Sequence, residues 1–298
     1  MFSPFATPRI VMPMGNAAPL ENRITELFPT LSHAHQKLAR LILDNGLFVA
    51  FASAAELGKQ VGVSNATVVR FCQALGYDGY PELQAAVRAN LPTYVHKVQQ
   101  IERKRSSVRT ENVLQRVFEL DTQNLNDTLA KLDQERFWPA VRAIGKAGHL
   151  LVVAGGLSAG PALYLAHSLN VMGFDARAAL NGGIPLTLEL ARLKPSSVLI
   201  GISVWRYVAD TVAAMEHAHR VGATRIAITD SLVAPIAQHA NFAFQIATDG
   251  TAHSLSLTSM LALINAFIAA LSFTRPKQTA RALRKIDAAY RRGKLVLE

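Results

Sequence analysis

The stretch LLVVAGGLSAGPALYLAHSLNVMG, residues 150–173, decides the fold that we predict for most of this chain. A run of apolar β-formers at Leu151–Val153 leads into the glycine pair Gly155–Gly156 and the small residues Ser158 and Gly160, and an apolar helical pattern follows. A strand that ends in such a loop and continues as a helix presents backbone N–H groups at the helix N-terminus, where an anion is stabilised. The stretch therefore predicts a strand–loop–helix unit that binds an anionic group.

Strands and helices alternate through the rest of this region. Apolar runs typical of strands lie at His149–Ala154, Asp175–Ala179, Val198–Ser203, Thr224–Thr229 and Asn241–Ile246. Helical patterns separate them at 158–172, 184–192, 208–221 and 234–237. This alternation predicts an α/β three-layer sandwich with a parallel sheet. Ligands of such sheets bind at the carboxyl ends of the strands, near the switch in strand order, so we expect the loops at 155–160 and 203–207 to lie side by side.

The N-terminal part of the chain has helical patterns, and two of them have the spacing of a helix-turn-helix. An S-x-x-E capping box at Ser53 begins a helix at Ala54–Val61. A tight turn at Gly62 follows, and Ser64 caps a helix at Asn65–Leu75. This arrangement predicts an all-α helix-turn-helix domain ahead of the sandwich.

The second helix of this pair has an apolar face and a polar face. Val68, Phe71, Cys72 and Leu75 recur at helical spacing, so we expect them to pack inward. In this motif the N-terminal part of the second helix enters the major groove, where side chains reach base edges and phosphates. We predict DNA contacts from the outward side chains, namely Ser64, Asn65, Thr67, Arg70 and Gln73. A plain helical hairpin, in which Arg70 is only a solvated charge, is the alternative.

Composition and charge agree with a two-part protein that binds nucleic acid. At 298 residues, 50% hydrophobic and 17% charged, the chain is long and apolar enough for two packed domains. The net charge of +10 comes from residues 1–110 and 277–298, which carry +5 each, whereas residues 111–276 are neutral. Double-stranded DNA is the expected partner of the basic ends, although a merely basic surface has the same composition.

Cysteine content and apolar runs bear on the cellular compartment of the protein and on whether it crosses a membrane. The single cysteine excludes an internal disulfide framework and fits the reducing cytoplasm. Residues 1–20 contain four prolines and no signal-peptide pattern, so we predict a disordered tail. The uncharged run Ser254–Thr274 is long enough for a membrane span, but its polar interruptions favour a helix buried in the core or in a dimer interface. We therefore expect no membrane partner.

The segment AAELGKQVGVSNATVVRFCQALGYDGYPELQAAV resembles the N-terminal domain of RpiR-type bacterial transcription regulators. Glu56–Leu57, Val63–Ser64, Ala66–Cys72 and Leu75–Tyr77 carry the match, which extends over about residues 25–92. The resemblance implies a domain that binds operator DNA as part of a homodimer or homotetramer.

The second region, about residues 125–270, resembles the sugar isomerase (SIS) domain of the same regulators, which is their phosphosugar-binding module. The likeness rests on Gly155–Ser158, Gly173, Ile202–Ser203, Asp210–Thr211 and Thr229–Ser231. The second loop departs from the usual pattern S-x-S-G-x-T, because Trp205, Arg206 and Val208 replace its second serine, its glycine and its threonine.

By this resemblance the region binds a small anionic sugar-type effector, and Gly156, Ser158 and Ser203 in the matched loops are predicted to contact it. We add Arg206, Tyr207 and His253 to the predicted site from their own chemistry and position. Arg206 offers phosphate or carboxylate a charge-assisted bidentate contact in place of neutral donors. Trp205 and Tyr207 have ring faces that stack on an apolar ligand surface. A packing or interface role for Trp205 and Arg206 is the alternative. His253 opens the last long helix, where a capping or surface role is equally open.

Several enzyme motifs are incomplete in this chain. Gly156–Gly160 matches the G-x-S-x-G nucleophile elbow, and Asp230 and His253 follow in hydrolase order, but the strands that precede the nucleophile in that fold are missing from the pattern. Leu157 replaces the middle glycine of a Rossmann fingerprint, and Pro161 stands where a P-loop needs lysine. Cysteine and histidine spacings do not fit a zinc site. We predict no catalytic residue, no metal and no cofactor.

These features together predict a transcription regulator in five parts. They are a disordered tail at 1–20, a helix-turn-helix domain at 21–96, a helical linker at 97–124, an SIS-type sensing and dimerisation domain at 125–274 and a basic helix at 275–298. A sugar-phosphate isomerase with an added helical domain is one alternative, although neither loop offers the acid–base pair that isomerisation needs. A structural DNA-binding protein whose sheet domain only dimerises is the other.

Overall fold

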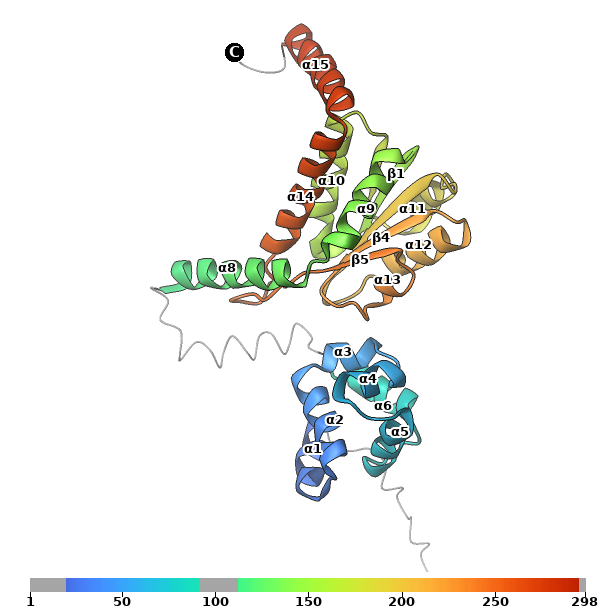
Figure 1. The fold of residues 1–298 in the computed structure, drawn as a ribbon, viewed down its shortest axis with the longest axis vertical. Coiled ribbons are helices and arrows are strands. Elements are labelled where there is room, and N and C mark those ends of the chain that lie inside the picture. Colours follow the sequence, from blue (N-terminus) through green and yellow to red (C-terminus); the bar gives the residue numbers. More distant parts are fainter. Residues whose placement is uncertain (1–19, 92–111, 295–298) are drawn as a thin grey trace, which may run out of the picture. The chain divides into compact units, whose positions relative to one another are not determined.

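The computed structural model describes residues 20–91 and 112–294, and the chain divides into two compact units on either side of the Leu91–Pro92 bond (Figure 1). Within the described residues, the first unit is helical and the second is an α/β unit, which agrees with the predicted fold classes. The predicted tail up to residue 19 and the basic linker residues Lys97–Arg109 lie outside the described part of the chain.

The first unit packs its helices around one apolar core. The helices are α1 (Leu20–Leu27), α2 (His33–Asp44), α3 (Gly46–Phe51), α4 (Ala54–Val61), α5 (Asn65–Ala74) and α6 (Tyr80–Ala89), with a 3-10 turn at Phe28–Thr30. Val68, Phe71 and Cys72 are fully buried in the core, as predicted for the inward face of α5. Burial raises the pKa of the Cys72 thiol to about 11, so this thiol stays protonated and unreactive at neutral pH.

Side chains of α6 bind the carbonyl groups that end α3. The Tyr80 hydroxyl lies 3.0 Å from the carbonyl oxygen of Val49 and 2.9 Å from that of Ala52, in donor geometry to both. The amide of Gln84 donates to Ala52 O at 2.7 Å. These contacts satisfy carbonyl groups that have no partner within the short helix α3. Hydrogen bonds between α6 and the end of α3 therefore stabilise this unit together with its apolar core.

The second unit contains a five-stranded sheet in which every strand is parallel, in the order β2-β1-β3-β4-β5. The strands are β1 (His149–Ala154), β2 (Ala176–Ala179), β3 (Ser197–Ile202), β4 (Thr224–Thr229) and β5 (Phe242–Gln245). The helices are α8 (Val113–Lys131), α9 (Gln134–Lys146), α10 (Ala159–Val171), α11 (Gly183–Leu190), α12 (Ala209–Arg220), α13 (Pro235–Gln238), α14 (Thr258–Thr274) and α15 (Pro276–Gly293). The five predicted strands are confirmed to within one residue at each end.

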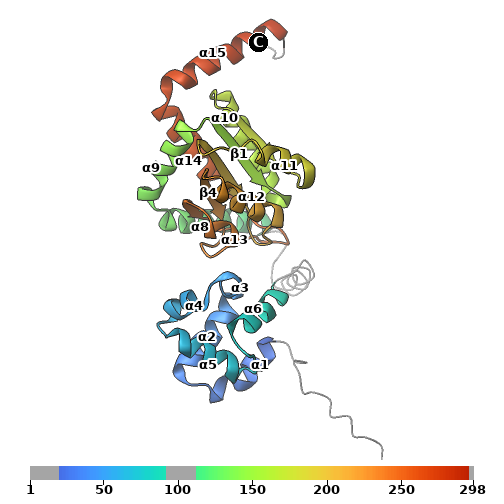
Figure 2. The same ribbon diagram turned by 90° about the vertical axis from the view of Figure 1, so that its right-hand side faces the viewer.

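Alternate residues of the strands form two separate cores, one on each face of the sheet. Helices cover both faces (Figures 1 and 2). Leu150 and Val152 face α9, α10 and α14, whereas Leu151 and Val153 face α11, α12 and α13. Side chains point to opposite faces at successive strand positions, and both faces are covered by helices, which explains the continuous apolar runs in the sequence. The three-layer sandwich is confirmed.

Helix α9 begins at Gln134, directly after a capping aspartate. The Asp133 carboxylate accepts the backbone N–H of Glu135 at 2.8 Å and caps the helix at Gln134. Pro139 is consequently the sixth residue of the helix and not part of its first turn. The capping carboxylate, and not the proline, sets this boundary.

Helix α14 is a core helix of the second unit. It buries Met260, Leu263, Ile264, Phe267 and Leu271, in agreement with the buried helix predicted for the uncharged run. Among the described residues, no single helix is long and apolar enough to cross a membrane. Helices α14 and α15 meet such a criterion only as a pair and are bent by 102° at their junction.

Candidate nucleic-acid interface and effector site

The helix-turn-helix is formed by α4, a left-handed turn and α5. Ser53 accepts the N–H of Glu56 at 3.2 Å, and the Glu56 carboxylate accepts the N–H of Ser53 at 2.7 Å, so the predicted capping box is present. Gly62 adopts φ of +75°, which a residue with a side chain rarely does. Gly58 lies so close to the turn that a Cβ there would be 2.6 Å from the carbonyl oxygen of Val63. Two glycines thus permit the tight turn between the helices.

The predicted DNA-contacting residues lie on the outer side of α5. Asn65, Arg70 and Gln73 are exposed, and Thr67 is half-buried. Ser64 caps the helix through its hydroxyl, which accepts the N–H of Thr67 at 3.2 Å. The two hydroxyl groups of Ser64 and Thr67 are 2.9 Å apart, and the Arg70 guanidinium donates to Thr67 Oγ1 at 3.3 Å. Ser64 and Thr67 therefore have a structural role that orients Arg70, beside any contact with DNA.

The second unit has a cavity of about 480 Å³ at the carboxyl ends of β1 and β3. Three segments far apart in sequence form its wall: the loop after β1, the loop after β3 and the segment before α14. The lining residues are Gly155, Gly156, Leu157, Ser158, Ser203, Val204, Trp205, Arg206, Val208, His253, Ser254 and Leu255. The loops after β1 and β3 lie side by side, as expected from the switch in strand order between these two strands.

The loop after β1 brings small residues and backbone against the cavity. Gly156 adopts φ of +56°, and the following 3-10 turn leads directly into α10. Ser158, at the start of α10, lines the cavity although only 3% of its surface is exposed. A Cβ on Gly155 would be 3.2 Å from a methyl group of Val208, so glycine allows the two loops to approach this closely. The N-terminus of α10 points its backbone N–H groups and partial positive charge to this end of the sheet.

The loop after β3 is held by a half-buried carboxylate, that of Asp230. Its Oδ2 accepts the backbone N–H of Trp205 at 2.7 Å, and its Oδ1 accepts the hydroxyl of Tyr207 at 2.8 Å. Trp205 adopts φ of +61°, an uncommon conformation for a bulky residue. The Ser203 hydroxyl accepts the N–H of Val208 at 3.2 Å and closes the loop from its other side. Asp230 thus stabilises a strained loop that carries Trp205 and Arg206.

Burial changes the acid–base properties of this pair. The pKa of Asp230 is raised, mainly by burial, although the hydrogen bonds from Tyr207 and Trp205 oppose the effect. The pKa of Tyr207 is raised by burial first and by the neighbouring Asp230 carboxylate second. Because the raised pKa keeps the phenol protonated at neutral pH, Tyr207 remains a hydrogen-bond donor to Asp230 there.

Five of the six predicted ligand-binding residues line the cavity, namely Gly156, Ser158, Ser203, Arg206 and His253. Tyr207 is not part of the wall, because its hydroxyl is bonded to Asp230. His253 lies in the loop that precedes α14 and does not open the helix. The helix begins at Thr258, whose N–H donates to the Ser256 hydroxyl at 3.2 Å.

The charge of the wall favours an anion. Arg206 is the charged side chain in it, and no Asp or Glu belongs to the lining among the residues that the structure describes. The Arg206 guanidinium lies 5.7 Å from the centre of the Trp205 ring, a cation–π distance. Leu157, Val204 and Leu255 add apolar surface. A ligand with one anionic group and one apolar face suits this combination.

Two groups of residues that matter here carry no clear signal in the sequence. Asp230 follows a strand in the stretch Thr229–Ser231, but nothing local indicates that its carboxylate binds the loop after β3, which lies 25 residues earlier. The second group is on α8, where Asp121, Asn124 and Thr128 bind the segment before α14. An amphipathic helix usually packs its apolar face against the core, so the sequence of α8 does not predict that these polar side chains face inward.

Comparison with known proteins assigns both units. A model of the helix-turn-helix domain of the rpiR family matches residues 18–93, and a model of the SIS domain matches residues 143–270. The crystal structure of the sugar isomerase domain of an RpiR transcription factor from Sphaerobacter thermophilus is 40% identical. The alignment covers 59% of this chain and 99% of that chain, with a TM-score of 0.58. The chain belongs to the RpiR family.

Two further relatives extend over both units of this RpiR-family protein. An uncharacterized HTH-type transcriptional regulator of Haemophilus influenzae is 28% identical over 232 residues, which are 77% of this chain and 80% of that protein. The Vibrio vulnificus NanR protein, complexed with ManNAc-6P, is 18% identical, with a TM-score of 0.66 over 94% of this chain and 100% of that one. The NanR likeness shows the fold. The protein is accordingly a DNA-binding transcriptional regulator.

The Asp230 carboxylate predicts a specific pH dependence of stability. Because its pKa is raised above the ordinary 3.8 in the folded state, the folded protein binds this proton more tightly than the unfolded chain. Its contribution to the free energy of unfolding is therefore present below pH 3.8 and is lost as the pH rises through the folded pKa. As the pH rises through the folded pKa, the free energy of unfolding of the wild type should fall relative to that of Asp230→Asn. The fall should be about 1.4 kcal/mol for each unit by which folding raises the pKa.

Denaturant unfolding between pH 4 and 7 measures this difference. Both tryptophans, Trp138 and Trp205, belong to the second unit, so their fluorescence reports its unfolding. Asp287→Asn removes an exposed carboxylate on α15, whose ion pair with Arg291 at 3.2 Å is open to solvent, and serves as the control, for which we expect a smaller change with pH than for Asp230→Asn. A flat difference for Asp230→Asn would show that the carboxylate is not destabilised by burial.

The exposed position of Arg70 on α5 predicts that this side chain contributes to operator binding. Arg70→Ala should weaken binding to an operator selected from random duplexes by about ten- to a hundredfold, because one base or phosphate contact is worth about 1–3 kcal/mol. Circular dichroism should be unchanged, because this side chain is exposed. Lys37→Ala, which removes an exposed cation from α2, should retain binding. Equal affinities of Arg70→Ala and the wild type, measured by fluorescence anisotropy, would exclude Arg70 from the interface.

Proposed function

We propose that this RpiR-family regulator senses a small anionic metabolite in the cavity between the loops after β1 and β3, and that the ligand changes its affinity for operator DNA. The observation that carries the proposal is a cavity wall with Ser158, Ser203 and Arg206 as polar groups and no carboxylate among its described residues, in a chain that also carries a helix-turn-helix. A ligand alters an equilibrium between two arrangements only by its difference in affinity for them. We expect the ligand contacts to supply that difference.

A sugar phosphate or a sugar acid fits the wall best. Hydroxyl groups of Ser158 and Ser203 are donors of the kind that bind sugar or phosphate oxygens, and Arg206 offers a guanidinium to an anion. Trp205 offers an aromatic face to the apolar side of a sugar ring. ManNAc-6P, the compound in the NanR complex, is the natural first probe.

We propose sensing and not turnover at this cavity. Isomerisation of a sugar phosphate requires a general acid and a general base beside the substrate. His253 is the titratable group of this kind among the described residues of the wall, and the half-buried carboxylate of Asp230 is bonded to Trp205 and Tyr207. The names of the matched regulators also support this choice. We place the protein in the cytoplasm, where operator DNA and a reduced Cys72 are both expected.

A thermal-shift screen of sugar phosphates and sugar acids tests the sensor, because a ligand that binds only the folded state raises the melting temperature. We expect at least one compound to bind, to change Trp205 fluorescence and to alter operator affinity without being converted. Arg206→Gln should weaken the binding of that compound about tenfold or more, because a charge-assisted contact is lost. Arg220→Gln removes an exposed cation from α12 and should leave the affinity unchanged. No hit in the screen, or a hit that leaves operator affinity unchanged, would refute the sensor.

We further propose that the regulator is a homodimer joined through the outer face of α8. Its large apolar side chains are exposed, with Leu114 at 73%, Phe118 at 68% and Leu129 at 70%. A neighbouring face of the helix is occupied within the same chain, because Asp121, Asn124 and Thr128 bind the segment before α14. A two-fold axis pairs such a face with itself, and a helix-turn-helix reads paired half-sites as a dimer.

Sedimentation equilibrium tests this face. Phe118→Glu should shift the full chain from dimer to monomer at micromolar concentration, since a charge then lies in the apolar contact. Gln123→Glu adds the same charge to an exposed position of α8, about 140° around the helix from Phe118, and should leave a dimer. A monomeric wild type, or a Phe118→Glu variant that dimerises like the wild type, would contradict the proposed interface.

A further inference from the structure

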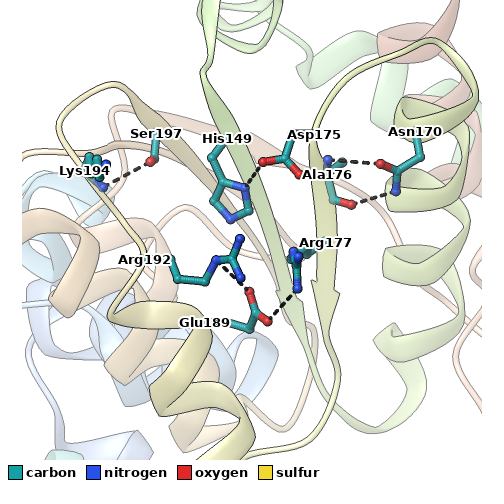
Figure 3. Close-up of polar contacts among 9 residues, drawn as sticks. All are labelled: His149, Asn170, Asp175, Ala176, Arg177, Glu189, Arg192, Lys194 and Ser197. Atoms are coloured by element: carbon teal, nitrogen blue, oxygen red, sulfur yellow. Dashed lines mark hydrogen bonds and ion pairs between the residues drawn. The ribbon is translucent and has the colours of Figure 1, made fainter. Parts of the chain in front are cut away.

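A second cavity lies at the amino ends of the strands, opposite the effector cavity (Figure 3). His149 begins β1 beside Ser197, which begins β3, and Asp175 immediately precedes β2. The cavity has a volume of about 430 Å³, and its wall includes His149, Asp175, Arg192, Lys194 and Ser196. That volume lies in the range of small-molecule sites. The cavity is formed at the far ends of β1 and β3, the strands that also carry the loops of the effector cavity.

The His149 ring is bonded at one nitrogen and lacks a partner at the other. Its Nδ1 is 2.8 Å from Oδ2 of Asp175, and the side chain is only 11% exposed. Because a carboxylate accepts hydrogen bonds, Nδ1 carries the proton in this contact. Nε2 is buried and has no hydrogen-bond partner among the described residues. Figure 3 shows this nitrogen on the side of the ring that faces Arg192. A buried polar atom without a partner is costly, which indicates a ligand group at this point.

Cations outnumber carboxylates around this nitrogen. The Arg177 guanidinium is 3.3 Å from Glu189 Oε1, whereas Arg192 Nε is 3.9 Å from Glu189 Oε2, beyond hydrogen-bonding distance. Lys194 has no carboxylate within 4 Å in the described part of the chain. In the described wall of the cavity, Arg192 and Lys194 are the cations, and Asp175, which is bonded to His149, is the carboxylate. The charge balance of the wall is positive, and Arg192 and Lys194 offer donors to an anion bound beside Nε2.

A tight turn fixes the backbone of Lys194 beside Ser197, at the start of β3 (Figure 3). The backbone N–H of Lys194 donates to Ser197 Oγ at 3.1 Å, and the N–H of Ser197 donates to Lys194 O at 2.8 Å. The N–H of Gly148, the residue before His149, donates to Ser196 O at 3.1 Å. These bonds order the backbone of the wall before any ligand arrives, so little ordering cost remains for binding.

We propose that this amino-edge cavity is an anion site that binds a phosphate group through His149 Nε2, the Arg192 guanidinium and the Lys194 ammonium. The phosphate is either inorganic phosphate or the phosphoryl group of a small metabolite, since both present the same oxygens. With Nδ1–H donated to Asp175, Nε2 accepts the O–H of a monoprotonated phosphate group, while Arg192 and Lys194 donate to its ionised oxygens. The site is separate from the effector cavity and stands independently of the sensor proposed there.

Isothermal titration of the full chain with inorganic phosphate tests the site at constant ionic strength. The Arg192→Gln and Lys194→Gln double variant should bind phosphate at least about tenfold more weakly, because two charge-assisted contacts are lost. The Arg284→Gln and Lys285→Gln double variant removes one arginine and one lysine that are exposed on α15, and should bind like the wild type. Glycerol 3-phosphate separates the two sources: tighter binding than inorganic phosphate indicates a phosphorylated metabolite, and equal or weaker binding indicates the free ion.

A second readout reports on His149 itself and does not depend on an altered chain. In nitrogen-15 spectra of histidine side chains, phosphate should shift the His149 Nε2 resonance in the wild type. The same shift should persist in Arg206→Gln, which weakens only the effector cavity, so that failure of the sensor and failure of this site are distinguishable. No phosphate binding at millimolar concentration, an unmoved His149 resonance, or equal affinity in the Arg192 and Lys194 double variant would overturn the proposal.

Discussion

The parallel pairing of β1 with β3 is the interaction on which the second unit depends. Six residue pairs, from His149 with Ser197 to Ala154 with Ile202, align the two strands. Because β2 pairs with the other side of β1, the helices that follow β1 and β3 leave toward opposite faces, α10 to one core and α12 to the other. The loops after β1 and β3 therefore diverge at the carboxyl ends of these strands and leave a crevice between them. The amino ends of the same two strands bring His149 beside Ser197, so one pairing positions both cavities.

Polar groups inside the second unit determine the shape of the effector site. The Asp230 carboxylate keeps Trp205 in a left-handed conformation that the residue itself disfavours, and it bonds Tyr207 away from the cavity. In the same way, the polar face of α8 keeps the segment that carries His253 against the sheet unit. Buried polar bonds of this kind add directional constraint that apolar packing lacks. The loop with Arg206 is thus a defined wall of the cavity.

The contrast between the two units follows from the range of the contacts in each. In the helix-turn-helix, Ser53, Gly62 and Ser64 act on residues within three or four positions of themselves, so local sequence predicts the helices, the caps and the inward face of α5. In the second unit, Asp230 binds a loop 25 residues away, and Asn124 binds Asp249 across 125 residues. Such contacts have no periodic signature. Tyr207 and the start of α14 depend on them, which is why the wall lacks Tyr207 and the helix does not begin at His253.

By itself the sequence determined the order of the strands and helices, the two-part organisation, the family, and the glycine- and serine-rich loop after β1, because each of these rests on local propensity, capping or apolar periodicity. Only the tertiary structure decided which loops share a cavity wall, that Asp230 stabilises the loop of Trp205, that α8 turns its polar face inward, and that His149 has one buried ring nitrogen beside Arg192. The physical reason is that hydrogen bonds and burial depend on distance in space, and residues brought together by a parallel sheet are separated by a whole helix in the chain.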